Sequence, residues 1–122
     1  MNAITMIRTA VTLLALGAVG GIVMALIRLS RNINPPSWLA MLHGFLAAAG
    51  ATLLLYAALT VGIPQVANVG LALLLIAALG GAVLNLKYQW ERVPLPVGLM
   101  VGHAVLAVIG FVLVFVVAWN GA

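Results

Sequence analysis

His43 and His103 are the residues of this 122-residue chain best suited to chemistry. Each lies in a hydrophobic stretch that exceeds the roughly 20 residues needed to cross a bilayer. A neutral imidazole can bind a metal ion or pass on a proton. Ionisable side chains are costly inside a membrane, so such residues are candidates for a functional site. A pair of them suggests one ligand shared between two helices.

The two histidines occupy the same place in a gapless internal repeat. The pattern P-x2-L-x3-H-x2-L-A-x2-G-x2-L begins at Pro36 and again, sixty residues later, at Pro96. Two Gly-Gly pairs, 20–21 and 80–81, align in the same register. Apolar helices match by chance at Leu, Ala and Val, but chance explains the shared Pro, His and Gly-Gly poorly. The repeat predicts that residues of about 5–60 and 65–120 share one fold, with one imidazole each.

The composition places the chain in a membrane. It is 66% hydrophobic and 5% charged, with five basic residues and one acidic residue. These values exclude an ordinary water-soluble domain, because so few charged residues cannot cover a surface that faces water. They also exclude a disordered chain, which would need a lower hydrophobic content and more charge. We therefore expect residues 1–122 to form a single transmembrane domain.

The residue inventory also excludes several classes of site. The chain has no cysteine, which excludes disulfides, thiolate metal sites, iron–sulfur clusters and covalent c-type haem attachment. The net charge of +4 does not indicate nucleic-acid binding, because the basic residues fall at predicted helix ends. There they orient the helices and meet lipid phosphates.

Four membrane-spanning helices are predicted, at about 5–29, 37–60, 66–88 and 96–119. The first resembles a signal peptide, but its apolar run continues to Leu29 without a clean cleavage site, which favours a retained helix. Prolines 35, 36, 64, 94 and 96 mark the breaks. The predicted fold class is all-α: an integral membrane four-helix bundle built from two tandem helical hairpins, related as a 60-residue parallel repeat.

Basic residues predict the orientation. Arg28 and Arg31 lie at the first turn, and Lys87 and Arg92, with Glu91, lie at the third. The second turn has no charged side chain. Arg8 is the only basic residue expected on the same side of the membrane as that turn. The positive-inside rule therefore places the first and third turns in the cytoplasm and both termini outside, in a bacterial inner membrane.

Small residues follow each histidine along its helix. Ala47 and Gly50 lie within about 40° of His43 on a helical wheel, and Ala107 and Gly110 repeat this after His103. The pattern predicts an inward strip against which a flat ligand could lie.

Glycines on the partner helices fall at the depth of the histidines. His43 is seven residues past Pro36, about 10 Å along a helix. Counting back from the basic turns along the partner helices places four glycines at the depth of the histidines: Gly20, Gly21, Gly80 and Gly81. Because glycine has no side chain, the helix surface is open there. Four cations form a predicted ring one to two turns nearer the cytoplasm: Arg28, Arg31, Lys87 and Arg92.

A single b-type haem (haem b) accounts for these features together. It needs two axial imidazoles, His43 and His103, small residues beside the ring, and cations for its propionates. In helix number, intramembrane histidine pair and glycines, the chain resembles the small four-helix membrane b-type cytochromes that serve dehydrogenases and hydrogenases. The resemblance implies an electron-transfer protein or redox-complex subunit without independent catalytic activity. Two histidines allow only one bis-histidine haem, where many of those cytochromes have two.

The resemblance also implies other partners. They are membrane lipid, further redox-complex subunits or a second copy of the chain, and a quinone, with no nucleic acid.

Other interpretations remain open. The histidines could be structural hydrogen-bonding residues in a cofactor-free subunit or assembly factor, and the glycines ordinary packing devices. A two-histidine zinc or copper site would lack further ligands. A small transporter would usually use a membrane carboxylate to couple protons, and Glu91, the only acidic residue, lies in a basic turn.

The orientation can be tested with fusion reporters. A C-terminal reporter that is active only outside the cytoplasm should be active, and a cytoplasmic reporter inserted between helices one and two should also be active. Both reporters behaving in the opposite way would contradict the N-out, C-out arrangement.

Overall fold

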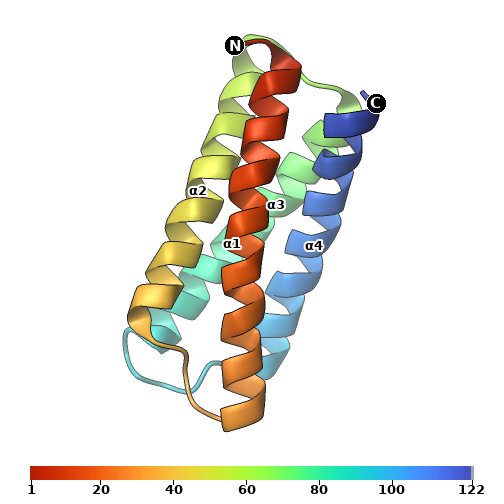
Figure 1. The fold of residues 1–122 in the computed structure, drawn as a ribbon. Helices are drawn as coiled ribbons and strands as arrows, with labels where there is room; N and C mark the ends of the chain where they lie inside the picture. Colours follow the sequence, from red (N-terminus) through yellow and green to blue (C-terminus); the bar gives the residue numbers. More distant parts are fainter. Residues whose placement is uncertain (122) are drawn as a thin grey trace.

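The computed structural model describes residues 1–121, which form four long helices and no strand (Figure 1). Helix α1 spans Ala3–Arg31, α2 Ser37–Thr60, α3 Gln65–Val83 and α4 Val97–Asn120. A π-helical segment, η1 (Leu84–Gln89), extends α3. All four helices are long and apolar enough to cross a membrane, which confirms the prediction of an all-helical chain with four such segments.

The helix ends follow the turn chemistry of the sequence. Asn2 caps α1 by accepting a hydrogen bond from the Thr5 amide, and Asn32 ends it in a left-handed conformation. Pro36 and Pro96 each lie one residue before their helix begins, where a missing N–H costs nothing. Their carbonyl groups accept from the amides of Ala40 and Met100.

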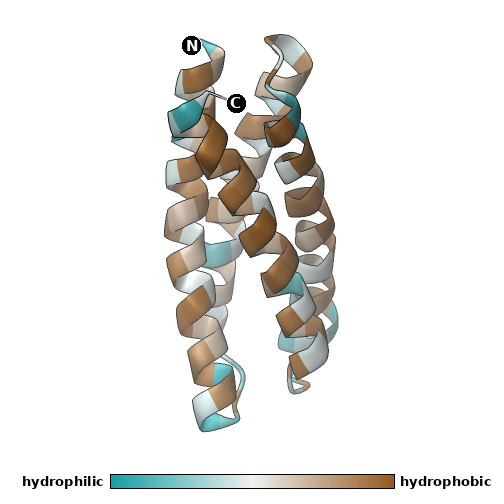
Figure 2. Ribbon diagram, turned by 90° about the vertical axis from the view of Figure 1, so that its right-hand side faces the viewer, coloured by the Kyte–Doolittle hydropathy of each residue, from teal (hydrophilic) through white to brown (hydrophobic). Residues whose placement is uncertain are grey.

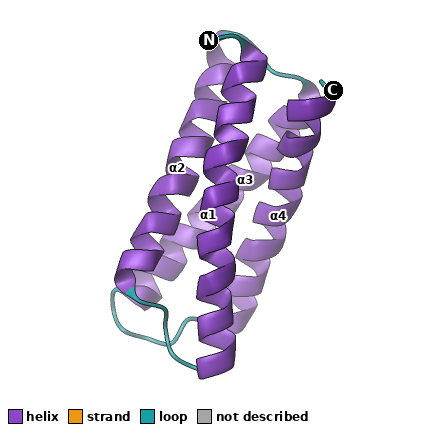
Figure 3. Ribbon diagram, in the orientation of Figure 1, coloured by secondary structure: helices purple, strands orange, loops and turns teal. Residues whose placement is uncertain are grey.

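The helices pair into two antiparallel hairpins, α1 with α2 and α3 with α4 (Figures 1 and 3). Helix α1 also contacts α4, and α2 contacts α3, so α2 and α4 lie across the bundle from each other. We call the end with both chain termini the terminal end. The other end, with residues 32–36 and 90–96, is the loop end.

The main contact between the hairpins lies in the terminal half of the bundle. Four large side chains are fully buried there, one from α1, one from α2 and two from α4: Ile7, Leu54, Val114 and Val117. Ala10, Ala67 and Ala118 are also inaccessible and let the helices approach. The hairpins are therefore joined most firmly away from the histidines.

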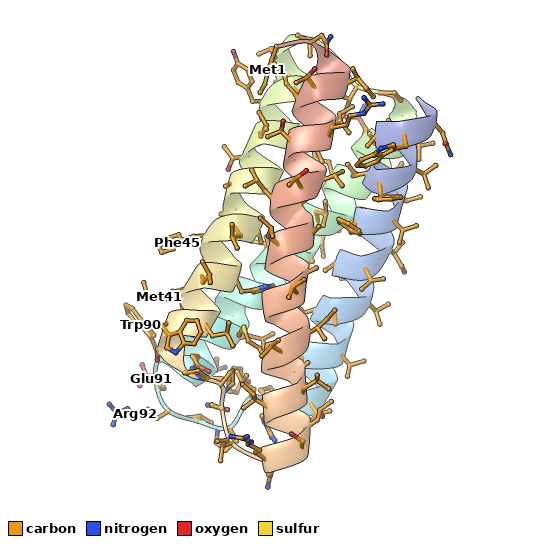
Figure 4. All side chains as sticks on the ribbon, viewed as in Figure 1. Met1, Met41, Phe45, Trp90, Glu91 and Arg92 are labelled. Atoms are coloured by element: carbon orange, nitrogen blue, oxygen red, sulfur yellow. The ribbon has the colours of Figure 1, made fainter. Side chains whose placement is uncertain are left out.

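Large apolar side chains are exposed on every helix, and Figure 2 shows apolar residues along the length of the helices. Phe45 is 68% exposed and projects from α2, and Leu79 is 71% exposed on α3 (Figure 4). Such continuous exposed apolar surface is typical of helices that face lipid, since monomeric soluble proteins rarely expose large apolar patches.

Hydrogen bonds join the two turns of the loop end. The Asn34 side chain donates to the Val93 carbonyl and accepts from the Leu95 amide. Arg28 Nε donates to the Leu95 carbonyl at 3.0 Å, and Gln89 Nε2 donates to the Pro35 carbonyl at 2.6 Å. Asn34 and Gln89, one from each hairpin, thus tie the hairpins together at this end.

Ala67 tests the packing of the terminal half. Replacing this inaccessible residue by leucine should lower the free energy of unfolding by about 1–3 kcal/mol, because the closely packed neighbours must move. Unfolding in detergent is the measurement, and Ala72→Leu, at an exposed position of the same helix, is the control. Equal stability of the two variants would contradict this packing.

Candidate functional site

His43 on α2 and His103 on α4 meet inside the bundle from helices on opposite sides. Their ring centroids are 6.2 Å apart, and the ring planes are inclined by 79°. Both side chains are half-buried. The structure thus brings together the two residues, sixty positions apart in sequence, that were predicted to share a ligand.

Each imidazole is held by a backbone carbonyl of its own hairpin. His43 Nδ1 lies 2.7 Å from the Gly17 carbonyl oxygen of α1, and His103 Nδ1 lies 2.6 Å from that of Ala77 in α3. A carbonyl only accepts, so Nδ1 carries the proton and donates in both rings. In a neutral imidazole this leaves Nε2 as an unprotonated nitrogen with a free lone pair.

Neither Nε2 has a hydrogen-bond partner among residues 1–121. This is the tautomer found in metal-binding histidines, whose second nitrogen donates to a carbonyl or carboxylate. Two neutral imidazoles with free Nε2 atoms could bind one metal ion or accept two protons.

The Gly-Gly pairs lie at the level of the histidines, on the partner helix of each hairpin. A Cβ atom at Gly21 would lie 2.9 Å from His43 Cε1, and one at Gly81 would lie 3.0 Å from His103 Cε1. Gly20 and Gly80 face the Cβ atoms of the same histidines at 3.6 and 3.8 Å. The space left by Gly21 and Gly81 is filled by the imidazole edges. We call His43, His103, Gly21 and Gly81 the histidine layer.

The small residues beyond the histidines face the partner helix of their own hairpin. A Cβ atom at Gly50 would meet Leu14 and the Ala10 carbonyl of α1 at 2.8 and 3.0 Å. Gly110 has the same relation to α3, where the Gly70 carbonyl lies 2.8 Å from its Cβ position.

Ala47 lies close to α1 in the same way, with its amide 3.4 Å from the Cβ position of Gly17, and Ala107 is half-buried. In this arrangement Gly50 and Gly110 serve close helix packing rather than lining an open strip.

The four predicted cations all lie at the loop end, but in different surroundings. Arg28 is half-buried, and it donates to the Leu95 carbonyl and to Asn32 Oδ1 at 2.8 Å. Arg31, Lys87 and Arg92 are exposed. The Lys87 Nζ atom lies 6.0 Å from the ring centre of Tyr88. The exposed three are therefore available to lipid or to a ligand at the membrane surface.

Sequence reasoning missed the backbone acceptors and the buried Gln89. The Gly17 and Ala77 carbonyls carry no side-chain signature, although each lies 26 residues before its histidine. Gln89 is turned inward at the end of η1, whereas Leu29, sixty residues earlier, is exposed on a regular α-helix. No sequence signal distinguishes that π-helical segment from the α-helix expected there.

Comparisons with models of known protein families, with curated proteins and with solved structures found no match for this chain. The site therefore has to be interpreted from its own geometry.

Bulk at the glycines of the histidine layer should displace the imidazoles. Gly21→Leu and Gly81→Leu should each lower the free energy of unfolding by about 1–3 kcal/mol, because the added side chain overlaps the ring. Gly44→Leu and Gly102→Leu are matched controls on α2 and α4, since a Cβ atom there meets nothing within 4 Å. Unchanged thermal unfolding of both Gly21→Leu and Gly81→Leu would show that the rings are not held against these glycines.

Proposed function

We propose that this chain is a membrane-embedded electron-transfer protein or redox-complex subunit that binds one haem b through His43 and His103. The observation that carries the proposal is the approach of two imidazoles from opposite helices. The ring centres are 6.2 Å apart, close enough for one metal ion to bind both imidazoles if their Nε2 atoms turn toward it, given metal–nitrogen bonds of about 2.0–2.1 Å.

The surroundings of the rings support the same proposal. The Nδ1–H bonds to Gly17 and Ala77 fix the orientation of both rings and raise the basicity of Nε2. None of the four helices contains a carboxylate. The single acidic residue of the chain, Glu91, lies in the α3–α4 turn. When bound, haem supplies reversible one-electron chemistry. The residues of this chain would hold it, keep water away from it and set its environment.

A haem macrocycle needs more room than the protein-only arrangement provides at the histidine layer. Two hollows of the described chain lie elsewhere, one lined by residues such as Asn34 and Gln89 at the loop end and one by residues such as Arg8 at the terminal end. Haem binding therefore requires the side chains and helices that flank the two imidazoles to open at this layer while the imidazoles keep their spacing. The hydrophobic core that joins the hairpins lies in the terminal half, away from this layer.

The same contacts occur in both hairpins, which supports an origin by internal duplication. The histidine-to-carbonyl bond and the glycine under the imidazole edge recur at positions sixty residues apart. We propose a pseudo-two-fold axis along the membrane normal, with the ligand on it. The proposed setting is a bacterial inner membrane, N-out and C-out. Other complex subunits, a second copy of the chain or a quinone are the proposed partners.

A second function is supported by the same hydrogen bonds. Each histidine already has an acceptor and a fitted glycine, so the pair could serve only to fasten α2 to α1 and α4 to α3 in a cofactor-free structural or assembly subunit. A histidine used only in this way leaves Nε2 without a role. The two functions differ in whether the purified protein carries haem.

The visible spectrum of the purified protein tests the proposal. We expect a red protein with a six-coordinate, low-spin b-type spectrum and about one haem per chain by pyridine haemochrome, since two imidazoles serve one iron. His43→Ala and His103→Ala should each lose most of the haem, because each removes one axial bond. Protein that stays colourless after haem is offered during folding would favour the structural function.

A control separates loss of haem from loss of fold. His43→Gln and His103→Gln keep a polar side chain of similar reach, and circular dichroism should show that both variants remain helical. A helical His103→Gln variant with full haem content would contradict the assignment of that residue as a ligand.

A further inference from the structure

A short polar face on helix α1 interrupts the apolar exterior near the terminal end. Its residues follow the spacing i, i+3, i+4 and i+7 of one helical face: Thr5, Arg8, Thr9 and Thr12. We call these residues the threonine–arginine face. A hollow of about 470 Å³ lies along it and also reaches Leu13. Further along the same side of α1, Leu16 and Val19 are exposed, so only the terminal part of this side is polar.

The hairpin fold itself does not depend on this face. The matching positions of α3, sixty residues later, have neither a cation nor a hydroxyl group: Gln65, Asn68, Val69 and Ala72. The histidine-to-carbonyl bonds and the glycines of the histidine layer nevertheless occur in both hairpins. The polar face of α1 therefore has a use other than closing its own hairpin.

Arg8 is held in a fixed position and keeps unused hydrogen-bond donors. Its Nε donates to the Ala118 carbonyl of α4 at 2.8 Å, and its guanidinium carbon lies 5.8 Å from the ring centre of Trp119. Neither Nη atom has an acceptor among residues 1–121. The single acidic side chain, Glu91, lies at the loop end, out of reach. An oriented guanidinium with unused donors matches the two oxygens of a carboxylate.

The threonines extend the polar face deeper into the membrane. Thr9 and Thr12 donate to the carbonyls of Thr5 and Arg8, so their hydroxyl oxygens can still accept. Thr12 lies four residues beyond Arg8, about 6 Å further along the helix. Threonine is enriched where membrane helices pack together, because it permits close approach and hydrogen bonds between helices.

We infer that the threonine–arginine face binds a transmembrane helix of a different subunit, whose aspartate or glutamate side chain pairs with Arg8. The carboxylate accepts from the two Nη atoms, and small or polar side chains of the partner helix meet Thr9 and Thr12 in the hollow. A second copy of this chain in the same orientation brings no acidic side chain to the terminal end. A lipid phosphate bound to Arg8 leaves the deeper Thr12 hydroxyl without a use.

The surface belongs to one of the proposed partners, a further membrane subunit, but it does not depend on haem. No residue of the histidine layer lines the hollow. The proposed N-out orientation also places Arg8 on the side of the membrane where basic residues are rare. Topology therefore does not explain this arginine, whereas an acidic partner does.

Association with model transmembrane peptides tests the inference. Full-length protein in phosphatidylcholine vesicles is paired by energy transfer with a polyleucine peptide that has a glutamate in its end turn and threonines in the next two turns. A matched peptide has glutamine in place of the glutamate. We expect the glutamate peptide to bind about tenfold more tightly, the effect of one hydrogen bond to a charged partner. Arg8→Gln should remove this preference, whereas Arg31→Gln, an exposed arginine at the loop end, should keep it.

Charge reversal and removal of a hydroxyl are the further variants. Arg8→Glu should reject the glutamate peptide and bind the same peptide with lysine at that position. Thr12→Val should weaken the glutamate and glutamine peptides equally, because it removes only the deeper hydroxyl. Circular dichroism checks that each variant remains helical. Binding of the glutamate peptide by colourless protein would support this inference even though it would contradict the haem proposal.

Three results would overturn the inference. The first is equal binding of the glutamate and glutamine peptides by the unaltered protein. The second is loss of the preference when phosphatidylglycerol replaces part of the phosphatidylcholine, which would assign Arg8 to a lipid headgroup. The third is energy transfer between differently labelled copies of the chain that Arg8→Gln abolishes, which would assign the face to a second copy.

Discussion

Two imidazoles in an apolar bundle each need an acceptor for their N–H group, and the rest of the structure is arranged around that need. An unpaired polar group in a water-free interior costs several kcal/mol on hydrocarbon transfer scales. The Gly17 and Ala77 carbonyls meet the need for Nδ1. A carbonyl within a helix already accepts one backbone bond and offers its second lone pair only to a closely placed donor. The partner helix must therefore come very near to the histidine.

Close approach explains the positions of the glycines. Gly21 and Gly81 let the imidazole edge lie against the helix that carries the acceptor. Gly50 and Gly110 bring the same pairs of helices together two turns further along. Each hairpin is thus a tightly packed unit with one oriented imidazole. The hydrophobic core between hairpins is displaced toward the termini.

The sequence predicted much of this architecture, because the relevant signals were local or periodic. The four apolar stretches and the prolines at 36 and 96 located the helices to within a few residues. The depth of Gly21 and Gly81 followed from counting along antiparallel helices. Helical-wheel angles put Gly50 and Gly110 on the same side of the helix as the histidines. Helical-wheel angles do not show that the partner helix packs against Gly50 and Gly110, because this depends on the distance between the two helices of each hairpin.

Other features depended on tertiary contacts that leave no mark in the sequence. The acceptors of the histidines are backbone atoms of residues 26 positions away. The inward turn of Gln89 follows from the π-helical segment that ends with it, Leu84–Gln89, and this conformation has no mark in the sequence. The bonds of Asn34 to Val93 and Leu95 link turns some sixty residues apart. A resemblance in helix number and histidine placement could not reveal these contacts.

Electron paramagnetic resonance of the oxidised, purified protein tests most directly whether both histidines bind one iron. If haem binding leaves the imidazole planes inclined by 79°, a low-spin ferric haem held by both residues would have nearly perpendicular imidazole ligands. The account predicts the single, strongly anisotropic low-spin signal of that arrangement, replaced by a high-spin signal in any haem that His43→Ala or His103→Ala retains. A low-spin signal that survives unchanged in either variant, or no haem iron signal in fully folded protein, would contradict it.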